Sequence, residues 1–185
     1  VPRTTDWRHR SGAGAGAGMM RRLLDCRMSF IWKRRESLLR DRFDALVVCS
    51  EKDRSYLGNV TRINVIPNGF NRPFHGPVHS PTKPARLGFI GLFDYHPNRD
   101  GVEWFIKNGW PLIKRKAPDV RLRLIGKGSD SQFSDMGPDI DGLGYVEDSS
   151  KEIDSWTAMI VPIRVGGGTR IKIAEAFSRK CPVVS

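Results

Sequence analysis

Cysteine and long apolar runs are scarce in this sequence, and each scarcity excludes a class of protein. The three cysteines, Cys26, Cys49 and Cys181, lie far apart and form no C-x-x-C pair, so neither a zinc site nor a disulfide framework is indicated. No apolar run approaches the roughly 20 residues that a membrane-spanning helix needs. The first residues also lack the charged-then-apolar order of a signal peptide. We therefore expect a cytoplasmic chain, or one that is peripheral at the inner face of the membrane.

Acidic residues are also few, with 20 Asp and Glu against 31 Lys and Arg, which gives a formal net charge of +11. Residues 1–42 hold eleven of the basic residues and four of the acidic ones. The basic character therefore belongs mainly to this N-terminal arm. With 39% hydrophobic residues, the 185 residues can bury a core and hold one domain or parts of two. Because the chain begins at Val1 and stops at Ser185 straight after an apolar run, we expect a piece of a longer protein.

The N-terminal arm joins a repetitive segment to a basic one. Residues 11–18 are glycine and alanine in alternation after a serine, and we expect a flexible loop because ordering so many glycines costs backbone entropy. A phosphate-binding role is the alternative for this segment. Residues 19–43 carry an imperfect apolar stripe among arginines and predict a helix. This helix would pack on a sheet or, as a peripheral membrane contact, rest on acidic lipid.

Two short strands are predicted after the arm. Residues 45–49 form a continuous apolar run, which is typical of a strand buried on both faces. Ser50 is placed to cap a short helix that runs to Leu57. A second strand at 63–66 ends in the turn signal Pro-Asn-Gly, and proline is frequent up to Pro84. We place a domain boundary at residues 68–84.

The rest of the chain alternates between strand and helix patterns. Strands are predicted at 87–90, 120–125, 142–146, 158–162 and 182–184, and helices at 98–116, 150–156 and 172–178, with a polar loop after 125. This order predicts an α/β fold with a Rossmann-like, doubly wound parallel sheet, whose ligands bind at the carboxyl ends of the strands.

The loop after the strand at 158–162 carries the strongest signal of chemistry. It contains Gly166, Gly167 and Gly168, whose backbone N–H groups can approach a ligand at the start of the next helix. Arg170 and Lys172 add positive charge where an anion would arrive. Together these features predict a cradle for a diphosphate. The alternative is a tight strand-to-helix turn with exposed basic residues.

Glu175 follows the glycines by about two helical turns. A carboxylate in that position can accept two hydrogen bonds from a ribose diol, so we predict a donor-binding role. The alternative is a solvated glutamate paired with Lys172 or Arg179.

These motifs resemble those of a known family. The loop at 166–176 is similar to the G-G-G-T-R-x-K-x-x-E-A loop in the C-terminal half of GT-B-fold glycosyltransferases of family GT4. The resemblance extends over roughly residues 43–185. Its other motifs are V-V-C-S-E at 47–51, V-I-P-N-G at 65–69, G-L-F-D-Y-H-P-N at 91–98, W-P-L-I at 110–113, L-I-G-K-G at 124–128, G-Y-V at 144–146 and P-V-V-S at 182–185.

The resemblance implies an enzyme that transfers a sugar from a nucleotide-diphosphate-sugar donor to an acceptor, with retention of the anomeric configuration and without a metal or other cofactor. It implies that residues 1–67 are the remnant of an N-terminal Rossmann-like domain, that 68–84 are a linker, and that 85–185 are an incomplete donor-binding domain. The acceptor, a glycan, lipid or small molecule, would bind in the N-terminal domain. We therefore expect this piece to be inactive alone.

The resemblance also implies which residues contact the donor, and this sequence differs from the family pattern at two of those positions. Gly167 stands where relatives carry a Glu that holds the donor sugar, and Leu92 stands where many carry an Arg on the diphosphate. We expect Arg170 and Lys172 to replace that charge and to stabilise the leaving diphosphate as catalytic groups.

Further donor-binding residues that the resemblance suggests are Gly91, Asn98, Gly126, Tyr145, Val146 and Thr169. Tyr95, His96 and Asn98 would lie in a loop at the cleft, where His96 could titrate near neutral pH. Asn98 could instead cap the following helix. The loop at 126–128 would flank the nucleotide, and Tyr145 and Val146 would line the base pocket.

Three other functions are alternatives to a glycosyltransferase. A nucleotide-sugar epimerase of the same fold would share the phosphate cradle. A dinucleotide-dependent oxidoreductase lacks support because no strand leads into G-x-G-x-x-G. A non-catalytic basic module could bind membrane or nucleic acid through the arm, but residues 43–185 show only weak charge and no RRM, KH or helix-turn-helix signature. We therefore expect no nucleic-acid partner.

Overall fold

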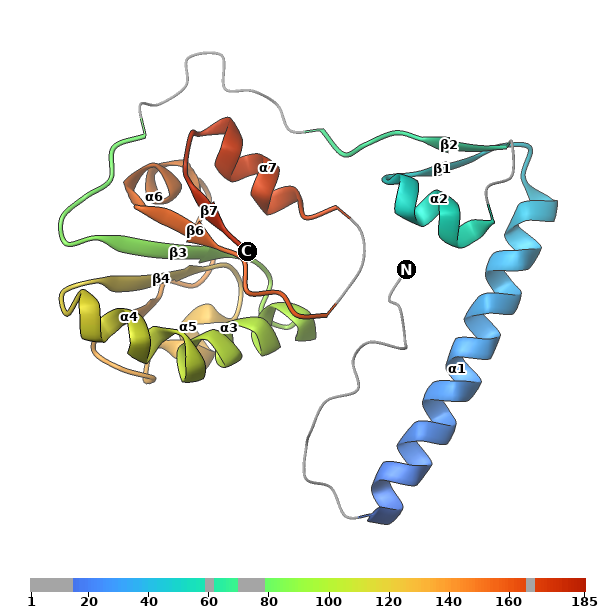
Figure 1. The fold of residues 1–185 in the computed structure, drawn as a ribbon, viewed down its shortest axis with the longest axis horizontal. Helices are drawn as coiled ribbons and strands as arrows, with labels where there is room; N and C mark the ends of the chain where they lie inside the picture. The colour runs from blue at the N-terminus through green and yellow to red at the C-terminus, as the bar shows by residue number, and fades with distance from the viewer. Residues whose placement is uncertain (1–14, 59–61, 70–78, 166–168) are drawn as a thin grey trace. The chain divides into compact units, whose positions relative to one another are not determined.

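The computed structural model of the chain describes residues 15–58, 62–69, 79–165 and 169–185. The chain divides into two compact units (Figure 1). The first comprises Val1–Asn68 and Val165–Thr169, and the second comprises Gly69–Arg164 and Arg170–Ser185. The domain limits inferred from the sequence, including a linker at 68–84, stay a prediction.

The first unit holds one long helix and a small α/β motif. Helix α1 spans Ala15–Arg42, and strands β1 (Leu46–Val48) and β2 (Ile63–Val65) pair in parallel with helix α2 (Glu51–Leu57) between them. The hydroxyl of Ser50 accepts a hydrogen bond from the backbone N–H of Asp53 at 3.1 Å, as the capping pattern predicts. Within the described parts of the chain, none of the helices is long and apolar enough to cross a bilayer.

Two predictions for the first unit are wrong. The four residues from 15 to 18 belong to α1 and not to a flexible loop, because extending a formed helix costs far less than nucleating one and alanine offsets part of the glycine penalty. The remainder of that segment, residues 11–14, lies outside the described residues. Strand β1 is not buried on both faces, since Val47 is 60% exposed. The membrane contact predicted for residues 19–43 stays a prediction.

The second unit is built on a sheet of five strands, all parallel, in the order β5-β4-β3-β6-β7 (Figure 1). The strands are β3 Arg86–Ile90, β4 Arg121–Ile125, β5 Ile140–Gly142, β6 Ala158–Ile160 and β7 Val183–Val184. The helices are α3 His96–Asn108, α4 Trp110–Lys116, α5 Ser129–Phe133, α6 Ser150–Ser155 and α7 Ile171–Ser178. This is the predicted Rossmann-like α/β fold.

The sheet of the second unit is covered on both faces. Helices α3, α4 and α5 pack on one face, and α6 and α7 pack on the other (Figure 1). Because successive side chains of a strand point to opposite faces, neighbouring residues contribute to separate cores. The first core includes Phe89, Val102, Trp110, Leu122, Leu124, Phe133 and Ile160, and the second includes Ile125, Ile153, Trp156, Met159, Val161 and Ala176.

The helix predicted at 98–116 is two helices that meet at Gly109. Pro111 has no backbone N–H to continue the hydrogen-bond ladder of α3, so a new helix begins at Trp110. Asn98 is not the cap of α3, because the helix begins at His96 with Tyr95 at the N-cap position. Its backbone N–H and C=O groups belong to the first turns, which frees its side chain for other contacts.

Two further differences concern the edge of the sheet after β4. The strand predicted at 142–146 is β5 at Ile140–Gly142. It ends there because Gly144 turns the backbone with a φ of 68°, which a strand does not adopt. The polar loop predicted after residue 125 contains the short helix α5.

Candidate functional site

The strand order reverses between β3 and β6 in the sheet of the second unit. Connections from these two central strands leave in opposite directions, and in folds of this kind ligands bind outside the carboxyl ends of such strands. The segment from Gly91 to Tyr95 follows β3, and the segment that leads to α7 follows β6. The site is therefore sought among side chains that meet at these two ends.

Lys172, near the start of α7, turns its ammonium toward the end of β3. Its Nζ donates a hydrogen bond to Oδ1 of Asn98 at 3.0 Å and lies 3.9 Å from the centre of the Phe89 ring. Such an ammonium over an aromatic face gains electrostatic attraction from the ring. Within the described residues, no Asp or Glu forms an ion pair with Lys172.

The surroundings of Lys172 disfavour its positive charge. Burial is the main cause that lowers its pKa to about 8 from the ordinary 10.5, and the nearby charge of Arg170 lowers it further. Glu175 acts in the opposite direction but only in part. The site thus holds two neighbouring cations, Lys172 and Arg170, with which no Asp or Glu in the described part of the chain forms an ion pair.

Asn98 links the two sides of the site. It is buried, at 9% exposure, and its Nδ2 donates to the backbone carbonyl of Leu92 at 2.8 Å while its Oδ1 accepts from Lys172. Gly91 gives this contact its space. A Cβ at that position would lie 2.7 Å from Nδ2 of Asn98 and 3.1 Å from Nζ of Lys172.

The two arginines beside the glycines have different roles. The guanidinium of Arg170, which occupies the N-cap position of α7, donates to the carbonyl of Ile163 at 3.2 Å and stays next to Lys172. Arg164 instead turns to α3, where it pairs with Asp100 at 2.8 Å and stacks on Trp104 at 5.6 Å. Arg164 therefore attaches its end of the loop to α3, and Arg170 adds positive charge to the site.

Gly126 supports the site through the backbone. Its φ is 126°, and a Cβ at this position would fall 2.0 Å from the carbonyl oxygen of Gly91. The N–H of Gly91 also donates to the carbonyl of Ile125 at 3.0 Å. Gly126 thus allows the loops after β3 and β4 to pack closely, which fixes the position of Gly91.

Other predicted residues make their described contacts away from Lys172, although the charge of Glu175 still favours the protonated lysine. Glu175 accepts a hydrogen bond from Ser149 at 3.0 Å, so it faces the segment before α6. Tyr145 is 78% exposed, and Val146 packs against the second core. Thr169 is grouped with the first unit.

Gly166, Gly167 and Gly168 lie outside the described residues, so the predicted glycine cradle has no structural account. Tyr95 is half exposed and His96 is exposed at the start of α3. Across the described ranges, no three His, Cys, Asp or Glu side chains are gathered to hold a metal ion.

Two members of the site were missed in the sequence. Phe89 supplies the ring beneath Lys172, and Leu92 supplies the carbonyl that orients Asn98. The alternation along the predicted strand places Phe89 in a core, but its contact with Lys172 joins residues far apart in the sequence and has no local signal.

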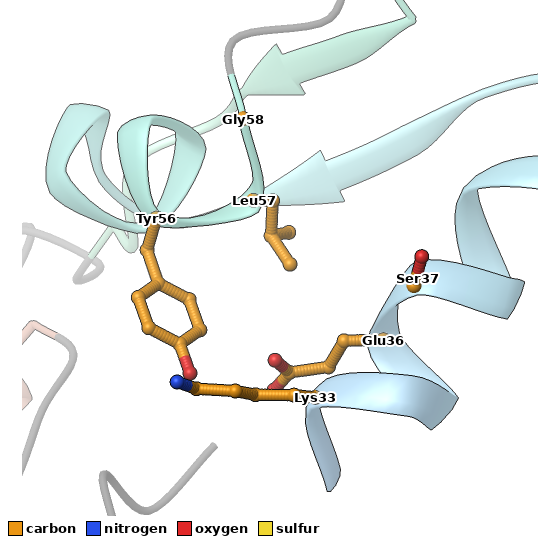
Figure 2. Close-up of a pocket in the computed structure, with 6 residues that line it drawn as sticks. All are labelled: Lys33, Glu36, Ser37, Tyr56, Leu57 and Gly58. Atoms are coloured by element: carbon orange, nitrogen blue, oxygen red, sulfur yellow. The ribbon is translucent and has the colours of Figure 1, made fainter. Parts of the chain in front are cut away.

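A separate pocket lies in the first unit between α1 and α2 (Figure 2). The side chains of Lys33, Glu36 and Tyr56 point toward one space there. Glu36 is 7% exposed, and its Oε1 has no hydrogen-bond partner among the residues that the structure describes. The sequence did not predict this pocket, and none of the predicted site residues lines it.

Comparison with protein families gives one match. The sequence model of the family described as Glycosyl transferases group 1 matches residues 84–185. That stretch contains all five strands of the larger sheet, and also Phe89, Gly91 and Asn98 beside Lys172. No curated protein gave a significant match.

Solved structures share the fold. TarM is similar with a TM-score of 0.63 and 18% identity over 77% of this chain and 29% of that chain. A mutant of S. aureus TarM in complex with fondaparinux, α-GlcNAc-glycerol and UDP has a TM-score of 0.59 and 18% identity, and the match covers 77% of this chain and 30% of that chain. The GtfA/B complex has a TM-score of 0.56 and 16% identity, and the match covers 80% of this chain and 31% of that chain. The present chain thus spans less than a third of each of these chains.

Proposed function

Because the chain belongs to the family of glycosyl transferases group 1, we propose that it is the donor-binding part of a retaining, metal-independent enzyme of the GT4 kind. This part binds a nucleotide-diphosphate-sugar, and the complete protein transfers the sugar to a glycan, lipid or small-molecule acceptor. The protein that carries it is cytoplasmic. Groups that bind the acceptor belong to the remainder of an N-terminal domain, so residues 1–185 bind donor without transferring sugar.

One observation carries this proposal. Lys172 holds an ammonium at the carboxyl ends of the central strands, buried enough to lower its pKa to about 8, with no carboxylate paired to it among the described residues. A buried charge without a counter-ion is costly in a protein. An anion at this place removes that cost, and a diphosphate bears the charge and the oxygens to engage both Lys172 and Arg170.

In the proposed reaction, these cations act on the leaving group. The bond between the anomeric carbon and the diphosphate oxygen breaks, and its electron pair passes to the diphosphate. The acceptor oxygen bonds to the anomeric carbon, and its proton passes to the leaving diphosphate. Negative charge therefore grows on the diphosphate in the transition state. Lys172 and Arg170 stabilise it as preorganised charges, which is the largest kind of contribution that a protein makes to such steps. Glu175 binds the ribose hydroxyls.

Ligand-observed NMR on the 185-residue chain tests the donor site. UDP, GDP and ADP are each compared with their nucleosides. We expect one diphosphate to bind, and Lys172→Ala and Arg170→Ala each to weaken it by about tenfold or more, because a hydrogen bond to a charged group contributes roughly 1.5–3 kcal/mol. Nucleoside binding should change little.

The control is Lys116→Ala, which removes an exposed lysine at the far end of α4. It should leave diphosphate binding unchanged. A folded chain that binds none of the diphosphates would overturn the proposal, and so would an equal loss of nucleoside and diphosphate in the two site variants.

A further inference from the structure

We propose that Asn98 is a positioning residue, which holds the ammonium of Lys172 beside Gly91 through a neutral acceptor and so keeps its charge available for an anionic ligand. The inference rests on the proposed function for the nature of that ligand, a nucleoside diphosphate. The contact itself is a property of the chain without ligand.

The orientation of the Asn98 amide is fixed by its two partners. The carbonyl of Leu92 can only accept a hydrogen bond, and the ammonium of Lys172 can only donate one. Nδ2 must therefore face Leu92 at 2.8 Å and Oδ1 must face Lys172 at 3.0 Å. A buried amide with both ends engaged cannot turn without losing both bonds, so the lysine is held at a defined point.

The other walls leave the ammonium little choice of position. The Phe89 ring lies below it at 3.9 Å, and Gly91 leaves no side chain between it and the end of β3. Ring and amide satisfy the ammonium only in part, because neither carries a negative charge. A bound anion would supply the negative charge that both of them lack.

The choice of an amide over a carboxylate at this position has a clear electrostatic consequence. An aspartate at position 98 would place a full negative charge at the distance where Oδ1 now lies. An opposite charge that close strongly favours the protonated lysine and would act as its permanent counter-ion. The diphosphate would then have to compete with it. Asn98 gives the same geometry without that competition.

The test is a pH titration of the Lys172 side chain by carbon-13 NMR on the full chain, with the signal assigned by its loss in Lys172→Arg. In the wild type, we expect a midpoint near 8. Asn98→Asp should raise the pKa of Lys172 by about one to three units, the range seen for close opposite charges. Asn98→Ala should lower that pKa, because it removes a hydrogen bond to the charged form.

The matched control is Asn108→Asp at the other end of α3. Asn108 is exposed and bonds only the carbonyl of Trp104, so its charge should leave the titration of Lys172 unchanged. A residue that merely stabilised the fold would not shift the pKa of Lys172 in opposite directions on change to Asp and to Ala. Amide spectra confirm that each variant is folded.

Binding of the diphosphate identified for the wild type completes the test. Asn98→Asp should weaken it by about tenfold or more, because the new carboxylate repels the anionic ligand and pairs with Lys172, while Asn108→Asp should not. An unchanged pKa in folded Asn98→Asp overturns the inference, whatever the binding result. A shifted pKa in a chain that binds no diphosphate overturns the proposed function and the ligand assigned here, but leaves the contact between Asn98 and Lys172 demonstrated.

Discussion

Lys172 is a partly buried cation, and no Asp or Glu of the described residues forms an ion pair with it. The groups that face it are Asn98 and Phe89 on one side, and Arg170 and Glu175 along its own helix and loop. Among these groups only Glu175 carries a negative charge, and it also accepts a hydrogen bond from Ser149. The protonation of this one residue therefore governs how strongly the site attracts a phosphate.

Binding of a nucleoside diphosphate should weaken as the pH rises through about 8. Above the lowered pKa, Lys172 is neutral and loses its attraction for the anion. We expect a loss of about tenfold between pH 7 and pH 9.5 by isothermal titration calorimetry, since each pKa unit corresponds to 1.36 kcal/mol. In Lys172→Arg, the guanidinium stays charged throughout this range, so a dependence on pH of the same size in that variant would contradict the prediction.

Replacement of Lys172 by Met should stabilise the chain while it abolishes diphosphate binding. The lowered pKa means that the unfolded state holds this proton more tightly, so wild-type stability is reduced at pH 7 and recovers as the pH rises from about 8 to 10.5. We expect a gain of about 1–3 kcal/mol in the free energy of unfolding at pH 7.

Urea unfolding at pH 7 and pH 10 measures this difference. The advantage of Met should shrink at the higher pH, where Lys172 is neutral in the folded state. Lys116→Met, at an exposed position, should be nearly neutral at both values. A Met variant that is less stable than the wild type at pH 7 would show that the ammonium contributes net stability.

Among the elements, β4, β5 and α6 are joined by a row of charges. Asp141 on β5 receives hydrogen bonds from Arg121 and Arg123 of β4, and Arg123 also pairs with Glu152 of α6 at 2.7 Å. The bond from Arg121 is the main cause that holds the pKa of Asp141 below its ordinary 3.8. This row lies on the sheet face that α6 covers, so it fixes that helix on the sheet.

Asp141→Asn should destabilise the chain by about 1–3 kcal/mol at pH 7, because two partly buried arginines lose a charged hydrogen-bond acceptor. A carboxylate with a lowered pKa gives its stability above 3.8, and that stability is lost as the pH falls through the folded-state value. The difference in free energy of unfolding between variant and wild type, measured by chemical denaturation, should therefore become smaller toward pH 3. Glu103→Gln, which changes an exposed carboxylate, should cost little at either pH, and an equal cost for both variants would argue against a special role for the row.

The order of strands and helices in the second unit was predictable, because each element carries its own periodicity. The two core faces follow from the alternation along β3, β4 and β6. The break at Gly109 could have been found from Pro111, whose missing N–H requires a helix start nearby. The contact between Asn98 and Lys172 could not, because it joins residues 74 positions apart through a strand order that local patterns do not specify. The burial that lowers the pKa of Lys172 depends on that same packing.

At the scale of the whole molecule, nearly all of the described apolar core lies in the second unit. Ile63 is the one buried hydrophobic residue of the first unit among the described residues. His79, Ser80 and Thr82 bond to backbone carbonyls at the end of α6, so the second unit is anchored from residue 79 onward.

A chain of residues 79–185 should therefore fold alone and bind the same nucleoside diphosphate as the full chain. Trp156 is fully buried in the second core, so its fluorescence should report one cooperative thermal transition. We expect binding within about twofold of the full chain, since a factor of two is worth less than 0.5 kcal/mol. A truncated chain that fails to melt cooperatively would show that residues before 79 contribute to the core, and a folded one that no longer binds would place part of the donor site there.

The neutral partner of Lys172 also bears on how this chain can change by mutation. A buried lysine that weakens the fold is retained only while selection requires what it binds, because substitutions that relieve the burden improve stability at once. In a chain that is no longer selected for anion binding, we expect apolar residues to replace Lys172 early. Substitutions of Asn98 would then also be tolerated. The presence of both Asn98 and Lys172 in a related sequence would therefore indicate that selection still maintains anion binding there.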